Sequence, residues 1–249
     1  MAGCQRLQAR RSVREGTAAY RAGDFRAAAD RFRAATRLEP ALATAHLNLG
    51  LTNLALFAAA PKGAARDRLA GEAITALQRY ARLRPGDSRP SGMLLSLWID
   101  SGRFDDALGY FRARLQKNPR DAETVKLLGV VSSKAGRFED ALRWYRRRTE
   151  LSPRDAEAHY AVGTLCWERL HDRATVAGGE RLRVADIGIA ALQRATELRP
   201  DYAEAWTYSN LLYRERALGQ QSEPARQQDL ADANRHYQRA LQILRARRK

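Results

Sequence analysis

Cysteine is scarce in this sequence, with only Cys4 and Cys166 among 249 residues. Two cysteines are too few for a disulfide framework or for a metal site built from thiolates. A long hydrophobic run is also missing, because polar side chains interrupt the most apolar stretch, residues 41–60, so no transmembrane helix is predicted. Stretches rich in Val, Ile and Thr are absent, while Ala, Leu, Arg and Glu dominate, and this balance favours helix throughout.

Lysine is also scarce. The net charge is +16, yet only five of the 44 basic residues are lysine and the others are arginine. A basic surface can attract nucleic acid, anionic lipid or an acidic partner. An arginine excess can equally reflect GC-rich base composition, and both explanations stay open. The basic clusters are Arg6-Arg10-Arg11-Arg14, Arg146-Arg147-Arg148 and Arg245-Arg247-Arg248-Lys249, and no RNA-reading aromatic motif accompanies them.

Signatures of catalysis are missing as well. The sequence has no phosphate-binding glycine loop, no dinucleotide fingerprint after a strand and no nucleophile elbow. We therefore expect no enzyme activity, no cofactor and no metal site.

A short motif recurs along the chain. The tripeptide Gly23-Asp24-Phe25 returns as Gly102-Arg103-Phe104 and Gly136-Arg137-Phe138, and two successive intervals between prolines, from Pro85 to Pro153, are 34 residues each. This period and the residues around it resemble the tetratricopeptide-repeat (TPR) family, whose motif is W-x2-L-G-x2-Y…A-x3-F…P. The small slot of the first helix holds Gly16, Gly50, Gly129 and Gly163, and the large slot of the second holds Phe32, Leu77, Phe111, Tyr145, Leu192 and Tyr237.

The resemblance implies an all-α fold, a right-handed α-solenoid of about six helix-turn-helix hairpins. Small residues in the first helix should let the second helix approach closely, and large residues should fill the remaining gaps. His46, His159 and Trp206 occupy the Trp slot, and Cys166 occupies the Tyr slot, so we expect packing roles for all four. We predict an N-terminal tail, 1–8, and a single TPR array, 9–249, with repeats at 9–41, 42–86, 87–120, 121–154, 155–201 and 202–249.

Three of these repeats are longer than the family motif. The proline interval is 45 residues in repeat two and 47 in repeat five, and the last repeat has a similar excess. Gly, Pro and polar residues place loops near 60–66, 173–181 and 219–227. The flanking helical pattern predicts that these three hairpins are also lengthened, and their loops should project from one rim.

The resemblance also predicts the binding surface. In TPR proteins the first helices line a concave groove, which here would be mostly aliphatic and aromatic and would suit an extended peptide or an amphipathic helix. Asn48 and Lys126 are the only remnants of the basic clamp by which some TPR domains hold a carboxylate, so we reject that mode. Leu47, Leu51 and Leu54 could instead contact a neighbouring hairpin. The predicted groove contains Tyr20, Leu47, Leu51, Leu54, Ile99, Lys126, Val130, Tyr160, Trp167, Leu211 and Arg214.

We therefore expect a protein-interaction scaffold or adaptor that helps to assemble a larger complex. The alternative is a basic surface that binds an anionic partner, either nucleic acid or membrane lipid. Taken literally, the sequence predicts a cytoplasmic protein. However, Met1-Ala2-Gly3-Cys4 resembles the end of a bacterial lipobox, in which the cysteine is lipidated after cleavage of a signal peptide. If the true start lies upstream, Cys4 would anchor a cell-envelope lipoprotein.

Overall fold

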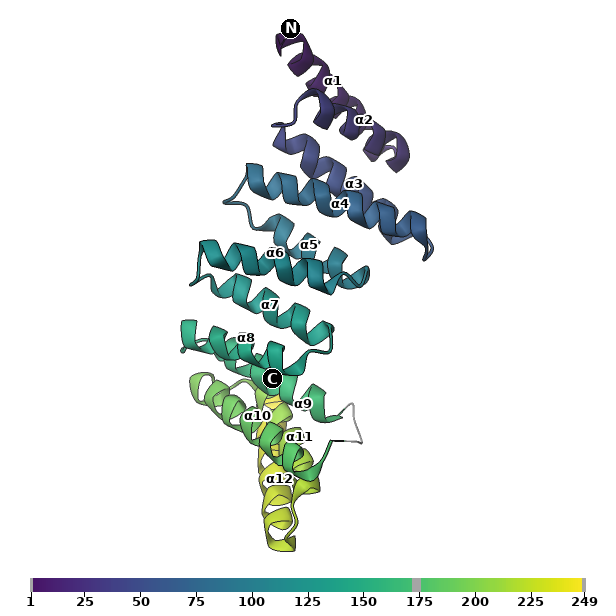
Figure 1. Cartoon of the computed structure of the whole chain (residues 1–249). Helices are drawn as coiled ribbons and strands as arrows, with labels where there is room; N and C mark the ends of the chain where they lie inside the picture. Colours follow the sequence, from purple (N-terminus) through teal and green to yellow (C-terminus); the bar gives the residue numbers. More distant parts are fainter. Residues whose placement is uncertain (1, 172–175, 248–249) are drawn as a thin grey trace. The chain divides into compact units, whose positions relative to one another are not determined.

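The computed structural model describes residues 2–171 and 176–247, and every regular element in these ranges is an α-helix (Figure 1). The predicted all-α fold of TPR hairpins is confirmed. The chain divides into two compact units, residues 1–107 and 108–249, and the boundary falls within a helix.

Unit 1 contains the first two hairpins and the first helix of the third. Its helices pack in chain order, α1 against α2, α2 against α3, α3 against α4 and α4 against α5. Residues 2–8, predicted as a tail, form the first turns of α1, because nothing in them stops a helix. The helices are α1 (Ala2–Arg21), α2 (Phe25–Leu38), α3 (Ala43–Ala59), α4 (Ala64–Leu83), α5 (Arg89–Asp100) and α6 (Phe104–Lys117), the last of which crosses the boundary.

Unit 2 contains the remaining three hairpins. Again each helix packs against the next, and α9 also contacts α11. The five predicted repeat ranges from residue 42 onwards each contain two consecutive helices, and the range 9–41 contains α2 and the larger part of α1. The helices of this unit are α7 (Ala122–Lys134), α8 (Phe138–Leu151), α9 (Ala156–His171), α10 (Gly178–Leu198), α11 (Ala203–Gly219) and α12 (Glu223–Ala246).

In the four hairpins with glycine in the small slot, the two helices meet at the slots that the repeat motif predicts. A Cβ added to Gly129 of α7 would lie 2.5 Å from Cε1 of Tyr145 in α8. At Gly16 the nearest atom would be in the ring of Phe32 at 2.8 Å, and at Gly50 it would be in Leu77 at 2.7 Å. Since carbon atoms in contact are normally about 3.5–4.0 Å apart, only glycine permits this approach. In these hairpins the glycine slot and the large-residue slot therefore determine how closely the two helices pack.

The recurring Gly-x-Phe tripeptide is the turn between the two helices. Gly23, Gly102 and Gly136 have φ angles of 81°, 70° and 72°, a left-handed conformation that glycine adopts at little cost. The first helices α1, α5 and α7 thus end in the same way, and the phenylalanine begins the second helix two residues later.

Aspartate caps the N-terminus of two first helices, α7 and α9. Asp121 accepts a hydrogen bond from the backbone N–H of Thr124 at 3.1 Å, and Asp155 accepts one from Glu157 at 2.9 Å. Asp201, the equivalent residue of repeat six, does not do the same, because α11 begins one residue later with Tyr202 as its N-cap.

The extra residues of the three long repeats lengthen helices more than loops. In repeat two α3 and α4 have 17 and 20 residues, compared with 13 and 14 in α7 and α8. The connections that remain are short, at residues 60–63 and 220–222. The third predicted loop falls partly on residues 172–175, which lie outside the described residues. Alanine, leucine and arginine dominate the additions, and their helical propensity accounts for the result.

Candidate functional site

The Trp slot forms the same hydrogen bond in three repeats. Nε2 of His46 donates to the backbone carbonyl of Pro40 at 3.0 Å, and Nε2 of His159 donates to that of Pro153 at 3.1 Å. In repeat six Nε1 of Trp206 donates to the carbonyl of Pro200 at 3.1 Å. Burial lowers the pKa of His46, which keeps its ring neutral near pH 7. These side chains tie each first helix to the end of the preceding repeat, which confirms the predicted packing role.

The residues predicted to line a groove all retain some exposure. Tyr20 is 39% exposed and its ring meets that of Phe25 at 5.0 Å between centroids. Leu47, Leu51 and Leu54 are half-buried, so neither partner binding nor contact with a neighbouring hairpin is decided for them. In unit 2 the half-buried members are Lys126, Val130, Tyr160, Trp167 and Leu211, while Arg214 is exposed.

Aromatic side chains gather where α9 contacts α11. The rings of Tyr160 and Trp167 in α9 both meet that of Tyr208 in α11 edge to face, with centroids 5.6 Å and 5.2 Å apart. His171 stacks on Trp167 at 4.5 Å. We call Tyr160, Trp167 and Tyr208 the aromatic group. All three are half-buried and pack on the core of unit 2, so each ring has one side fixed and part of its surface open. Sequence reasoning placed Tyr160 and Trp167 together but missed Tyr208.

Hydrogen bonds hold the base of the aromatic group. The hydroxyl of Tyr202 donates to Glu157 at 2.7 Å, and Arg199 donates to the same carboxylate at 2.8 Å. The Tyr202 ring lies 4.8 Å from that of Tyr160. Burial and the nearby Tyr208 hydroxyl raise the pKa of Tyr160 to about 12, so its hydroxyl is protonated at neutral pH. The aromatic group is therefore uncharged, and Tyr202, held by its hydrogen bond to Glu157, supports the ring of Tyr160.

A polar network joins the lengthened hairpins of unit 2. Arg181 of α10 pairs with Glu215 of α11, and both side chains are largely buried. Arg216 binds Asp229 of α12 at 2.6 Å and Asp186 of α10 at 2.9 Å. These partners are 13 to 34 residues apart in sequence, and no spacing in the repeat motif indicates that they meet. The network orders the added turns of three helices.

Family models identify this architecture. Two models described as tetratricopeptide repeat match the chain, over residues 13–88 and 99–165, which together are more than half of it. The chain is a TPR protein. No curated protein matches its sequence.

Solved structures of other proteins are similar to this chain at low sequence identity. YrrB, described as a TPR protein with an unusual peptide-binding site, is 18% identical, with 78% of this chain and 88% of YrrB covered and a TM-score of 0.46. MamA from Desulfovibrio magneticus RS-1 is 16% identical over 78% of this chain and 94% of MamA, with a TM-score of 0.48. A monomeric IFIT1 mutant with Gppp-AAAA is 16% identical over 92% of this chain and 49% of that one, with a TM-score of 0.50. These likenesses show the fold alone.

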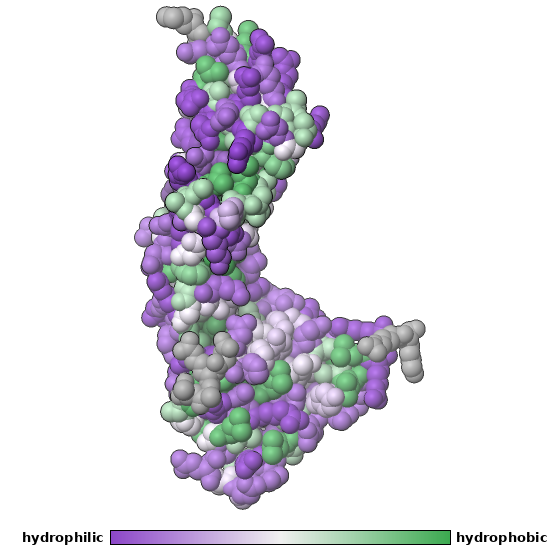
Figure 2. Space-filling model, turned by 90° about the vertical axis from the view of Figure 1, so that its right-hand side faces the viewer, coloured by the Kyte–Doolittle hydropathy of each residue, from purple (hydrophilic) through white to green (hydrophobic). Residues whose placement is uncertain are grey.

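Membership of the TPR family supports a role as a protein-interaction scaffold, and TPR proteins are typically not enzymes. In the described ranges no three His, Cys, Asp or Glu side chains are arranged to hold a metal ion. Nor does any described helix have the length and apolar character needed to cross a membrane. On the face drawn in Figure 2, hydrophobic residues form separate small patches between hydrophilic ones.

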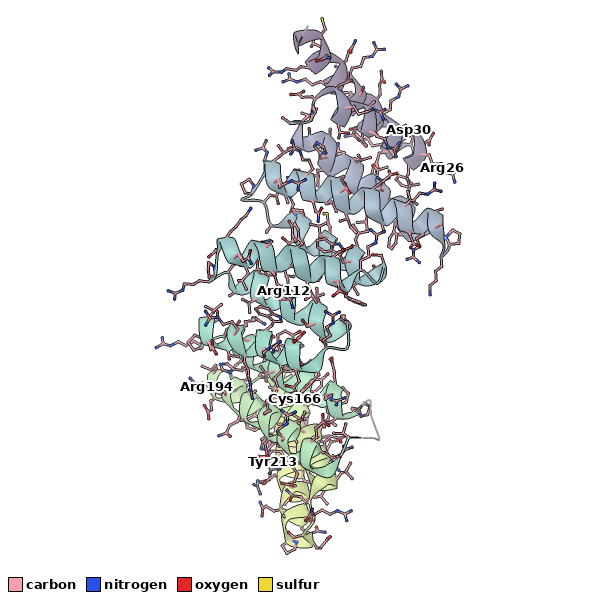
Figure 3. The ribbon with its side chains drawn as sticks, in the orientation of Figure 1. Arg26, Asp30, Arg112, Cys166, Arg194 and Tyr213 are labelled. Atoms are coloured by element: carbon pink, nitrogen blue, oxygen red, sulfur yellow. The ribbon has the colours of Figure 1, made fainter. Side chains whose placement is uncertain are left out.

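The two cysteines of this TPR protein differ sharply. Cys166 of α9 is fully buried, and burial raises the pKa of its thiol to about 12 (Figure 3). Its side chain lies close to Gly188 of α10, where an added Cβ would be 2.8 Å from the cysteine Cβ. The predicted role as a small buried hydrophobe is confirmed. Cys4 is exposed on α1.

Many arginines of the TPR helices are engaged in ion pairs. In the central basic cluster, Arg147 pairs with Glu150 and Arg148 with Asp155, both at 2.8 Å. In the first cluster Arg11 pairs with Glu15 at 2.8 Å. Such pairs use the arginines to connect neighbouring turns and helices, and exposed ones contribute at most about 1 kcal/mol each.

Proposed function

We propose that this TPR protein is a scaffold or adaptor that binds a peptide or an amphipathic helix of a partner protein on the face formed by its first helices. The bound partner would be a component of a larger complex that the scaffold helps to assemble. In unit 1 the binding residues would be Tyr20, Leu47, Leu51, Leu54 and Ile99. In unit 2 they would be Lys126, Val130, Tyr160, Trp167, Leu211 and Arg214.

The aromatic group is the observation that carries this proposal. Interface residues that dominate affinity are enriched in Trp and Tyr, because large rigid rings bury much area and lose little conformational entropy. Tyr160, Trp167 and Tyr208 are each half-buried, and ring contacts fix their positions before any partner arrives. Pre-organised rings with open surface suit the apolar side chains of a peptide or helix.

The test compares two tryptophans of unit 2. The wild-type chain and its Trp167→Ala and Trp144→Ala variants would be used as bait in affinity purification with quantitative mass spectrometry. Trp144 is the control, because it is also half-buried but lies on the second helix α8. Affinity for each recovered partner would then be measured by isothermal titration calorimetry.

We expect Trp167→Ala to weaken partner binding by roughly 2 kcal/mol or more, about 30-fold, and Trp144→Ala to leave it unchanged. Circular dichroism would verify that both variants keep their helices. Equal binding by Trp167→Ala and wild type would refute the proposed face. Unfolding of Trp167→Ala would assign this side chain to the core instead, and Tyr208→Phe and Leu211→Ala would then test the same face.

A basic surface that binds nucleic acid or lipid is the second candidate. Ion pairs argue against binding of an anionic partner, because carboxylates already partly neutralise Arg11, Arg147 and Arg148. The two functions differ in salt dependence. Binding to a polyanion releases counterions and falls steeply with salt, whereas an apolar face responds little. Attachment to the cell envelope through Cys4 stays a separate prediction, tested by the DNA upstream of the first codon.

A further inference from the structure

A second surface of unit 1 lies on the side of its second helices. A depression of about 900 Å³ is bordered by α2 and α4 and has α3 beneath it. Its floor is apolar and includes the buried side chains of Leu49, Ile74 and Ala76. We call this depression the α2/α4 groove. It does not include the first-helix face described above.

Arginines border this groove, and they differ in whether they have partners. Arg33 of α2 binds Glu72 of α4 at 2.7 Å and also Asp30, which is labelled in Figure 3. Within residues 2–171 and 176–247, by contrast, the side chains of Arg68, Arg79 and Arg82 have no hydrogen bond or ion pair. All three line the groove from α4. Three guanidinium groups are therefore available to an incoming anion.

The equivalent groove of unit 2 provides an internal comparison. It lies between α8 and α10, measures about 400 Å³ and includes His159 and Val162, which occupy the slots of His46 and Leu49. When Ala73 of α4 is aligned with Gly188 of α10 in the Ala slot, Arg68 corresponds to Arg183 and Arg79 to Arg194.

Both arginines of unit 2 are neutralised. Arg183 pairs with Glu139 at 2.9 Å, and Arg194, labelled in Figure 3, pairs with Glu197 at 2.9 Å. The residue of α4 that corresponds to Glu197 is Arg82. At the same repeat positions, the arginines of α10 form ion pairs, whereas those of α4 form no ion pair within the described residues. Repeat packing does not require the free arginines, since the hairpin of unit 2 folds with them neutralised.

We propose that the α2/α4 groove binds an acidic, extended segment of a partner protein, whose carboxylates pair with Arg68 at one end and with Arg79 and Arg82 at the other. Arg68 and Arg79 are eleven residues apart on α4, which at 1.5 Å per residue is roughly 16 Å. An extended peptide advances about 3.3 Å per residue, so its two acidic ends would be separated by about five residues. Small aliphatic side chains between them would lie on Leu49 and Ile74.

The lining of the groove favours a peptide over nucleic acid. Sequence-tolerant binding of single strands needs aromatic rings on which bases stack, and His46 is the only aromatic ring among the described residues that line the groove. Arginine forms two parallel hydrogen bonds with a carboxylate, which matches isolated acidic side chains at a fixed spacing.

The experiment selects ligands without assuming their sequence. A phage library of random heptapeptides would be panned on the full chain, and enriched peptides would be labelled with fluorescein for anisotropy titrations at low and physiological salt. The test variant is Arg68→Ala/Arg79→Ala. The matched control is Arg183→Ala/Arg194→Ala, which removes the same charge from the equivalent positions of unit 2. A labelled oligouridylate of twelve nucleotides serves as the nucleic-acid probe.

The proposal expects enrichment of peptides with acidic residues near both ends and aliphatic residues between them. Relative to the wild-type chain, binding of these peptides should weaken at least tenfold in the test variant and change less than twofold in the control. Binding should also be weaker than wild type in Arg82→Glu, which introduces the glutamate found in unit 2. Trp167→Ala should leave it unchanged, which separates this groove from the first-helix face. Absence of acidic enrichment, equal loss in both double variants, or a groove-dependent affinity for oligouridylate alone would each overturn the proposal.

Discussion

The contact between Gly129 and Tyr145 gives the sharpest test of how the hairpins are held together. A Cβ at Gly129 would lie 2.5 Å from Cε1 and 2.7 Å from Cδ1 of the Tyr145 ring, and Tyr145 is 9% exposed. Relief to a normal contact of about 3.5 Å requires the helices or the ring to move by roughly 1 Å. The ring is rigid and buried, so Gly129→Ala must force α7 and α8 apart or distort the ring's rotamer.

The magnitude follows from a control glycine. Gly109 of α6 is exposed, and an added Cβ would meet nothing within 4 Å. Both positions are inside helices, so alanine contributes a similar gain of about 1 kcal/mol in helical propensity at each. The difference in stability between Gly129→Ala and Gly109→Ala therefore isolates the overpacking cost, which we expect to be about 1–3 kcal/mol.

Urea unfolding followed by circular dichroism at 222 nm would measure this difference. Gly109→Ala should raise the unfolding midpoint and Gly129→Ala should lower it. Combining Gly129→Ala with Tyr145→Ala should cost less than the sum of the two single changes, because the new methyl group then occupies part of the space the ring leaves. If Gly129→Ala were as stable as Gly109→Ala, close packing at the small slot would not hold this hairpin together.

Two further predictions concern the cysteines and the hydrogen bonds of Glu157. In the native protein at pH 8 a thiol reagent should modify Cys4 but not Cys166, because Cys166 is buried and burial raises its pKa to about 12; labelling of both before unfolding would contradict the described packing of α9. Hydrogen bonding from Tyr202 and the charge of Arg199 lower the pKa of Glu157 despite its partial burial, so its contribution to stability is present above pH 4.5 and is lost as the pH falls through the lowered folded-state value. Glu157→Gln should therefore flatten the acid side of a profile of Tm against pH. An unchanged profile would show that Glu157 does not contribute to the pH dependence of stability.

Much of the fold could be predicted from the sequence, because the repeat is encoded locally. Glycine slots, large-residue slots and the 34-residue period recur at fixed offsets, and each offset corresponds to one helix face. Hence Gly129 and Tyr145 could be matched before their contact was seen, and His46 and His159 could be assigned a packing role. The same reasoning placed Tyr160 and Trp167 on one face of α9, since they are seven residues apart.

Only the tertiary structure decided where side chains from different hairpins meet. Tyr208 completes the aromatic group although the motif assigns it no role there, because α9 and α11 come close enough for their rings to touch. The pairing of the arginines also depends on the tertiary structure. Arg183 pairs with Glu139, which is 44 residues away, while the side chain of Arg68 at the equivalent position has no partner in the part of the chain that the structure describes. An ion pair forms only within about 4 Å, and the distance between two such residues depends on helix packing that a repeat pattern does not specify.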